Sequence, residues 1–336
     1  MEAREVLVTI RLNQKHLQQI REVDPRLRVH YLVDETAQPD APRAIISSPA
    51  PPEELARVLQ GTEILFTLRV SPDLLARAPR LKWVHLSSHG IDHIQGSDIL
   101  NSPVLVTCSR GAYAAPVAEH ALWMMLSLVK EGPRLYRQQQ EKKWERFPLG
   151  DMEGKTLGLV GLGSIAHRAA HLARALGMRV LGTKRHPQSW DPGLAPVDQV
   201  LPPSQLHRLL GESDFVLVTV PLTPETRELI GEAQLRAMKP TAYLINVARG
   251  GVVDEVALVR ALKEGWIAGA GLDVFQREPL PPESELWALP NVISSPHIAG
   301  VTPRLWDRAT DAFCQNLRRY LAGEELLNRV DREKGY

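Results

Sequence analysis

The sequence is poor in cysteine, because its 336 residues include only Cys108 and Cys314, which lie far apart along the chain. Two distant thiols provide neither a disulfide framework nor the closely spaced ligands of a metal site. We therefore expect no bound metal. A chain without a disulfide framework is typical of a reducing compartment, so a cytoplasmic location is the default expectation.

Long apolar runs and a net charge are also missing. The most apolar window, Ala114 to Val129, contains Pro116, Glu119 and His120, so it is too short and too polar to span a bilayer. The 40 Lys and Arg residues nearly balance the 39 Asp and Glu residues. No broad electrostatic field therefore attracts nucleic acid or an anionic membrane, and we expect neither as a partner.

Short apolar runs alternate with helical segments in two blocks of the chain. In the first hundred residues the runs that resemble strands are VLVTI (6–10), AIISS (44–48), ILFTL (64–68), WVHLSS (83–88) and VLVT (104–107). From Lys155 onward the second series is TLGLVGLG, RVLGT, FVLVTVP, AYLINVA, GAGLDVF and NVISSPH. Such alternation is typical of βαβ units. The sequence therefore predicts an α/β fold with two doubly wound, parallel-sheet domains.

The last predicted helix decides the expected domain boundaries. Residues 302–321 form one long helical pattern, in which Pro303 is acceptable in the first turn. Because this helix adds no strand to the second sheet, we expect it to cross back to the first domain. The expected domains are residues 1–104 plus 300–336, and residues 105–299. Another helix is predicted over 114–130, and its apolar spacing suits either the core or a dimer interface.

A glycine pattern follows the first strand of the second series. In TLGLVGLGSIAHRAAHLARALG, Gly161, Gly163 and Ala166 lie between an apolar strand and an amphipathic helix. The first glycine allows a tight turn, the second lets the backbone approach a pyrophosphate, and the helix N-terminus offers N–H groups to the anion. A glycine pattern alone is weak evidence, but strand, loop and helix in register favour a dinucleotide-binding site.

The end of the next strand indicates which dinucleotide. An acid there would bind the ribose 2′-hydroxyl of NAD, whereas this chain has Thr183, Lys184 and Arg185. Since arginine can bind a 2′-phosphate with two hydrogen bonds, we expect NADP(H) to be preferred, with NAD(H) possible. The alternative is a solvated basic turn, with an acidic residue reaching in from elsewhere.

Three further stretches lie at or after the ends of strands: INVARGGVVDE, GLDVFQREPLPPESELWALPN and SSPHIAG. They present Arg249, Glu278 and His297 at the sheet edge where open α/β folds place their ligands. Together with SSHGIDHI near residue 90, these motifs resemble the D-isomer-specific 2-hydroxyacid dehydrogenase family, in its glyoxylate/hydroxypyruvate reductase subgroup. The resemblance covers nearly the whole chain and is thinner before residue 80.

Each of the three side chains suits the reduction of a 2-keto acid. His297 can donate the proton because its ordinary pKa lies near neutral pH. Glu278 would hydrogen bond the other ring nitrogen and favour the imidazolium. Arg249 has the planar fork that suits a substrate carboxylate and can also polarise the keto oxygen. The alternative is a structural ion pair between Arg249 and Glu278, with His297 capping a strand.

The resemblance implies a Rossmann-type cofactor domain and a flavodoxin-like substrate domain with a cleft between them. It also implies that backbone N–H groups of the SSHGIDHI loop face the substrate, that Asp273 hydrogen bonds the nicotinamide amide, and that VPLTPETREL passes the adenosine. The expected substrate contacts are Ser88, His89, Gly90, Ile91, Arg249 and His297. The expected cofactor contacts are Gly161, Gly163, Ser164, Ile165, Thr183, Lys184, Arg185, Val220, Pro221, Thr226, Val247, Ala248, Arg249, Asp273, His297 and Gly300.

Three positions depart from the family pattern. Ser109 stands where relatives commonly have Asn, Ser295 replaces the usual Thr before Pro-His, and Ala166 replaces the third glycine. None of these changes removes a catalytic group. The resemblance thus implies a homodimer that reduces glyoxylate or hydroxypyruvate to the D-2-hydroxy acid. The alternatives are a D-3-phosphoglycerate or D-lactate dehydrogenase and, from another class, a dinucleotide-binding transcriptional corepressor.

Overall fold

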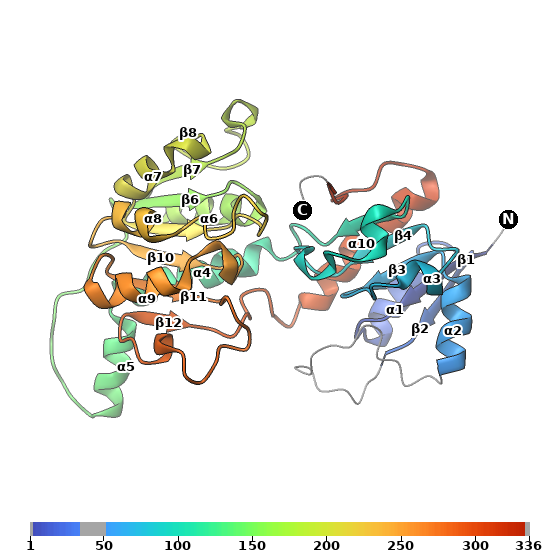
Figure 1. Cartoon of the computed structure of the whole chain (residues 1–336), viewed down its shortest axis with the longest axis horizontal. Coiled ribbons are helices and arrows are strands. Elements are labelled where there is room, and N and C mark those ends of the chain that lie inside the picture. Colours follow the sequence, from blue (N-terminus) through green and yellow to red (C-terminus); the bar gives the residue numbers. More distant parts are fainter. Residues whose placement is uncertain (1–2, 34–51, 333–336) are drawn as a thin grey trace. The chain divides into compact units, whose positions relative to one another are not determined.

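The protein divides into two compact units in a computed structural model that describes residues 3–33 and 52–332. One unit comprises Met1–Tyr113 and Thr302–Tyr336, and the other comprises Ala114–Val301. Each unit contains one sheet, and every strand pair within these sheets is parallel (Figure 1). The α/β prediction with two parallel sheets is therefore confirmed. Within the described residues, no helix is both long and apolar enough to cross a membrane.

The first unit contains a five-stranded sheet in the order β2-β1-β3-β4-β5, which is the order of flavodoxin-like folds. Its strands are β1 (Arg4–Val8), β2 (Leu27–Tyr31), β3 (Ile64–Thr67), β4 (Trp83–Leu86) and β5 (Leu105–Cys108). Because β5 pairs with β4, the first unit extends to Tyr113, beyond the expected boundary at residue 104. Strand β2 was not predicted, since LRVHY has few apolar residues. The predicted strand at 44–48 lies outside the described residues.

Helices cover both faces of this sheet (Figure 1). They are α1 (Gln14–Arg21), α2 (Pro52–Gly61), α3 (Leu74–Arg77) and α10 (Leu305–Ala322), with short 3-10 turns η1 (Asp92–Ile94) and η2 (Asp98–Asn101). Helix α10 packs beside α1, and Phe313 on α10 stacks on Phe66 of β3 with ring centroids 4.3 Å apart. The long C-terminal helix therefore belongs to the core of the first unit, because its buried aromatic ring completes the packing of that sheet.

The second unit contains a seven-stranded sheet in the order β12-β11-β10-β9-β6-β7-β8. Its strands are β6 (Thr156–Val160), β7 (Arg179–Thr183), β8 (Gln199–Leu201), β9 (Phe215–Val218), β10 (Tyr243–Asn246), β11 (Gly269–Leu272) and β12 (Val292–Ser294). The order reverses at β6, as it does in Rossmann-type dinucleotide-binding folds. Strands such as β9 are buried and apolar throughout, as expected for a sheet covered on both faces. Strand β8 (QVL) was not predicted.

Helices α7, α8 and α9 cover one face of the second sheet, and α4 and α6 cover the other (Figure 1). The bounds are α4 (Ala114–Val129), α5 (Gly132–Gln140), α6 (Ser164–Ala175), α7 (Leu206–Glu212), α8 (Glu232–Ala237) and α9 (Glu255–Glu264), with 3-10 turns η3 (Pro187–Ser189), η4 (Pro203–Gln205), η5 (Gly250–Val252) and η6 (Glu285–Trp287). The predicted helix over 114–130 is confirmed, whereas the polar helix α5 was not predicted.

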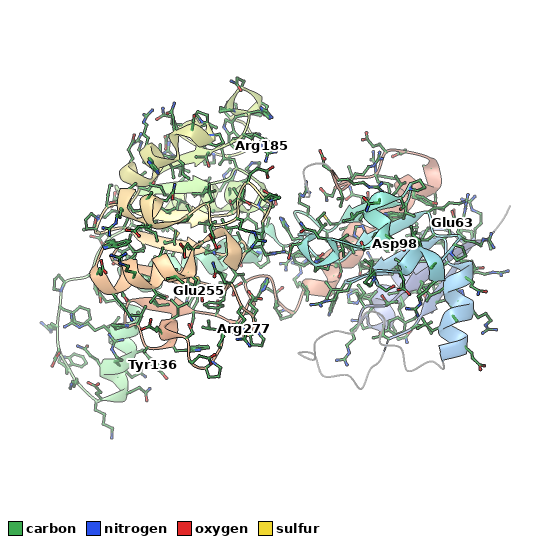
Figure 2. The ribbon with its side chains drawn as sticks, viewed as in Figure 1. Glu63, Asp98, Tyr136, Arg185, Glu255 and Arg277 are labelled. Carbon is green, nitrogen blue, oxygen red and sulfur yellow. The ribbon has the colours of Figure 1, made fainter. Side chains whose placement is uncertain are left out.

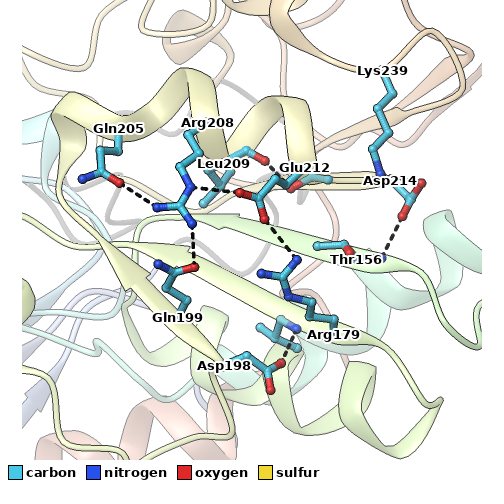
Figure 3. A network of polar contacts seen from close by, with 12 residues as sticks. Thr156, Arg179, Asp198, Gln199, Gln205, Arg208, Leu209, Glu212, Asp214 and Lys239 are labelled. Carbon is cyan, nitrogen blue, oxygen red and sulfur yellow. Dashed lines mark hydrogen bonds and ion pairs between the residues drawn. The ribbon is translucent and has the colours of Figure 1, made fainter.

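Charged side chains gather at the amino ends of the strands in the second sheet (Figure 3). Asp214 accepts hydrogen bonds from the backbone N–H of Thr156 at 2.8 Å and from Lys239 Nζ at 3.1 Å. Glu212 accepts one from Arg179 at 3.0 Å. Ion pairs near the surface each contribute little to stability. They occupy the edge opposite the carboxyl ends of the strands, where the predicted site residues lie.

Candidate active site

The backbone of the glycine loop between β6 and α6 lies close to the chain that follows β9. Gly161 has a φ of +96°, and a Cβ there would lie 2.7 Å from Val220 Cγ1, so only glycine fits without displacing the chain after β9. Gly163 forms the N-cap of α6, provides no side-chain cap, and has open space where a Cβ would be. An uncapped helix N-terminus with room beside it fits a pyrophosphate.

The residues predicted to contact the adenosine side of the cofactor lie at the end of β7 and differ in burial. Thr183 is buried, and its Oγ1 accepts a hydrogen bond from the N–H of Gly161 at 3.1 Å, so this hydroxyl supports the glycine loop. Lys184 Nζ lies 5.4 Å from the ring centroid of Trp190, and Arg185 is exposed (Figure 2). The pKa of Glu225 is lowered, chiefly by a hydrogen bond from Thr223 and in small part by the charge of Arg185.

His297 and Glu278 form the central contact of the site. Nδ1 of His297 lies 2.7 Å from Oε2 of Glu278, with exposed side-chain fractions of 47% and 36%. The hydrogen bond to Glu278 raises the pKa of His297, although burial and the charge of Arg249 oppose it. Burial raises the pKa of Glu278, but hydrogen bonding and charge from His297, with smaller effects of Phe275 and Arg249, lower it overall. The arrangement favours an imidazolium beside a carboxylate.

His297 occupies a strained backbone position. Its φ of 55° lies in the left-handed region, which costs a residue other than glycine about 1 kcal/mol or more. Its N–H donates to the backbone oxygens of Asp273 at 2.8 Å and Ser295 at 3.0 Å. The carboxylate of Asp273, 2% exposed, accepts hydrogen bonds from the N–H groups of Ile298 and Ala299 at 2.9 and 3.0 Å. Asp273 therefore holds the loop that carries His297.

Arg249 follows β10 and is half-buried. The side-chain amide of Asn246 donates to the backbone oxygen of Arg249 at 3.1 Å and accepts from the N–H of Ala248, and these two bonds fix the turn. A Cβ on the next residue, Gly250, would fall within 3.0 Å of three backbone atoms of Phe275 and the residue after it. This close approach packs the Arg249 turn against the loop of Glu278. The charge of Arg249 lowers the pKa of both Glu278 and His297, so the three side chains share one electrostatic environment.

The remaining cofactor candidates lie at the same edge of the second sheet. Val220, Pro221 and Thr226 follow β9, and Thr226 Oγ1 donates to the Pro221 oxygen at 2.6 Å, which folds that loop. Val247 and Ala248 follow β10 and are buried. The structure therefore brings the predicted cofactor candidates to the carboxyl ends of strands β6, β7, β9, β10, β11 and β12.

The predicted substrate loop lies in the first unit, after β4. Ser88 Oγ donates to the Gly90 oxygen at 2.8 Å, and the N–H of Ser109 donates to the Ser88 oxygen at 3.0 Å. Ser109 also contacts the buried ring of His85, whose pKa is lowered to about 3 by burial. His93 Nε2 lies 2.6 Å from the Leu68 oxygen, so it donates to backbone. The serine in place of the family's usual asparagine thus supports this loop.

Sequence analysis missed the side chains that support the site from behind. Asn246 and His85 are buried polar residues within strands, and His120 lies on α4, far along the chain from its contact with Ser295. A polar residue inside an apolar run was the only available signal. It does not identify the partner, because the partner is brought near by folding alone.

A Rossmann-type sheet whose carboxyl edge carries a glycine loop and an Arg, Glu and His set defines a nicotinamide-dependent dehydrogenase. The sequence model of the family described as "D-isomer specific 2-hydroxyacid dehydrogenase, NAD binding domain" matches residues 122–299. The chain is 39% identical to the glyoxylate reductase of Thermofilum pendens over 293 residues, which covers 84% of this chain and 85% of that protein. It is 38% identical to that of Korarchaeum cryptofilum over 278 residues, covering 80% and 82%.

Solved structures agree with these relatives. A D-isomer specific 2-hydroxyacid dehydrogenase from Xanthobacter autotrophicus, in complex with NADPH and MES, is 30% identical, has a TM-score of 0.81, and is matched over 99% of this chain and 100% of that one. An NADPH-dependent glyoxylate/hydroxypyruvate reductase from Sinorhizobium meliloti is 25% identical, with a TM-score of 0.80 and coverage of 98% and 99%.

The chain therefore belongs to the D-isomer-specific 2-hydroxyacid dehydrogenase family, as its motifs predicted. It is an oxidoreductase that uses a nicotinamide dinucleotide and acts on a small hydroxy or keto acid.

Proposed function

We propose that this protein reduces glyoxylate or hydroxypyruvate to the D-2-hydroxy acid, with NADPH preferred over NADH. The observation that carries the proposal is the 2.7 Å contact between His297 and Glu278, in the electrostatic range of Arg249, at the edge of a dinucleotide-binding sheet. Relatives named glyoxylate reductase, which are 35–39% identical over most of the chain, support this choice of substrate.

Each residue of the set has a defined part in the reaction. A nicotinamide dinucleotide bound at the glycine loop would supply the hydride for the carbonyl carbon. His297 donates a proton from Nε2 to the keto oxygen, because Nδ1 is engaged by Glu278. Glu278 keeps the ring oriented and charged. Arg249 binds the substrate carboxylate and polarises the keto oxygen as negative charge develops on it.

The preference for NADPH rests on the two basic residues that follow Thr183. Lys184 and Arg185 supply positive charge where an NAD-specific protein would carry an acid. Thr223, Glu225 and Thr226 form the neighbouring turn, and Glu225 is near enough to Arg185 to be affected by its charge. This carboxylate would bind a ribose hydroxyl, so NADH remains a second cofactor.

We also propose a cytoplasmic homodimer. The outer residues of α4, α5 and the segment after α5 expose several large apolar side chains: Trp123, Leu135, Tyr136, Trp144 and Leu149. Trp144 is 91% exposed and Tyr136, on α5 in Figure 2, is 64% exposed. An exposed apolar surface of this kind is typical of a protein interface. Sedimentation equilibrium of the intact protein tests the dimer, and a monomer at micromolar concentration would contradict it.

The experiment that tests the function is a steady-state panel of glyoxylate, hydroxypyruvate, pyruvate and phosphohydroxypyruvate, each with NADPH and NADH. We expect the highest kcat/KM with glyoxylate or hydroxypyruvate and NADPH. Highest activity on phosphohydroxypyruvate or pyruvate would replace the proposal with a D-3-phosphoglycerate or D-lactate dehydrogenase. The absence of turnover with all four acids would favour the dinucleotide-binding corepressor.

A further inference from the structure

A buried chain of hydrogen bonds runs from helix α4 to the loop that carries His297. Nε2 of His120 lies 2.8 Å from Oγ of Ser295, and that Oγ lies 2.6 Å from Oδ1 of Asp273. Ser295 and Asp273 are buried, and the side chain of His120 is 18% exposed. All of these residues lie in the second unit. The function described above uses His297 but gives no task to His120.

The direction of these hydrogen bonds follows from the number of protons available. The carboxylate of Asp273 only accepts, so Ser295 donates its single hydroxyl proton to Oδ1. The oxygen of Ser295 must then accept from His120, which therefore carries a proton on Nε2. A neutral ring in this tautomer and an imidazolium both satisfy the contact. Burial lowers the pKa of His120, and the charge of Asp273 opposes that effect.

The same carboxylate fixes the strained loop. Asp273 Oδ1 accepts from Ser295 Oγ and from the N–H of Ile298, while Oδ2 accepts from the N–H of Ala299. Between these anchors lies His297, held with a φ of 55°. A residue keeps such a conformation only when its surroundings determine it fully. Ser295 and His120 complete that set of contacts from the side of α4.

We propose that His120 and Ser295 are positioning residues for the acid His297. Their contacts orient the carboxylate of Asp273 and the backbone at 295, and so hold the imidazole within hydrogen-bonding distance of Glu278. The proposal rests on the proposed role of His297 as the proton donor. Threonine, which is usual in the family at position 295, provides the same hydroxyl for these contacts. Loss of the contact would let the loop relax, and misplacement of a reacting group by about 1 Å can cost about 100-fold in rate.

The test measures kcat, KM, cofactor affinity and the pH profile of kcat in the full chain. We expect His120→Ala and Ser295→Ala each to lower kcat about 10-fold, with NADPH affinity by fluorescence titration changed less than about twofold. His120→Gln, whose Nε2 can donate to Ser295, and Ser295→Thr should stay within about threefold of the parent. The matched control is His171→Ala, because His171 is an exposed histidine on the adjacent helix α6.

Two further measurements separate positioning from general damage. If both residues act through one contact, His120→Ala combined with Ser295→Ala should be no slower than either single variant, whereas independent effects would multiply to about 100-fold. The alkaline limb of the kcat profile should also move to lower pH, because a looser ring loses part of its bond to Glu278. The charged groups that act on His297 are Glu278, Arg249 and Asp273, and none is changed in these variants.

The outcomes also distinguish this proposal from the proposed function. An unchanged kcat and an unchanged alkaline limb in His120→Ala, with His297→Ala inactive, would overturn the positioning role and leave the proton donor intact. Full activity of His297→Ala would overturn both. A lower melting temperature in His120→Ala without a change in kcat would assign His120 to stability alone and reject the proposal. A low kcat in His120→Ala that His120→Gln does not restore would also reject it.

Discussion

Gly250 offers a sharp test of how backbone packing determines the position of Arg249. Replacing it with alanine adds one carbon that would fall within 3.0 Å of the backbone of Phe275 and Gln276. An ordinary contact is about 3.5 Å, so the Arg249 turn or the loop leading to Glu278 must retreat by roughly 1 Å or more. Overpacking of this kind costs about 1–3 kcal/mol of stability.

The neighbouring residue provides a matched control. A Cβ at Gly251 would meet the side chain of Leu222 at 3.4 Å, which is an ordinary contact. We therefore expect Gly251→Ala to retain the kinetics and melting temperature of the parent. Gly250→Ala should lose about 100-fold in kcat/KM because both Arg249 and Glu278 are displaced from the reacting groups. Thermal unfolding and steady-state kinetics measure the two effects, and equal behaviour of the two variants would refute the packing argument.

Three other changes test the site. His297→Ala should lower kcat by about two to four orders of magnitude while cofactor binding persists; unchanged turnover would remove the acid from the mechanism. Glu278 raises the pKa of His297, and reduction needs the imidazolium, so the rate is high below that pKa and falls as the pH rises through it. In Glu278→Gln the fall in kcat should come at lower pH, and a profile that does not move would contradict the pairing. Neutralising Lys184 and Arg185 together should lower kcat/KM for NADPH by about tenfold or more and leave NADH within about threefold; a parent enzyme that prefers NADH would already contradict this prediction.

Local pattern was sufficient to predict most of the fold. Apolar runs bounded by turns predicted four of the five strands of the first sheet. The fifth, β2, was missed because it is a polar edge strand. The run predicted at 44–48 lies outside the described residues. The glycine loop was predicted because strand, turn and helix are adjacent in sequence. In contrast, the boundary after residue 104 was placed too early, because strand pairing between β4 and β5 is a long-range contact.

The structure shows what two of the predicted cofactor residues contact within the protein. Thr183 was predicted from its place at the end of β7. Its hydroxyl accepts from Gly161 and supports the glycine loop, and its contact with the cofactor stays a prediction. Asp273 was expected at the nicotinamide amide, whereas its carboxylate accepts three hydrogen bonds from the loop of His297. A carboxylate oxygen can accept more than one bond, so the cofactor contact of Asp273 stays a prediction.

The sequence by itself determined the identity and chemistry of the groups: a glycine turn before a helix, two basic residues after the next strand, and an arginine, a glutamate and a histidine after later strands. These features depend on residue type and on neighbours a few positions away. Only the tertiary structure decided which groups meet. Parallel strands brought Glu278 and His297 to 2.7 Å, and the packing of α4 placed His120 against Ser295, 175 residues away. Such contacts depend on how distant segments pack, which cannot be predicted from local sequence.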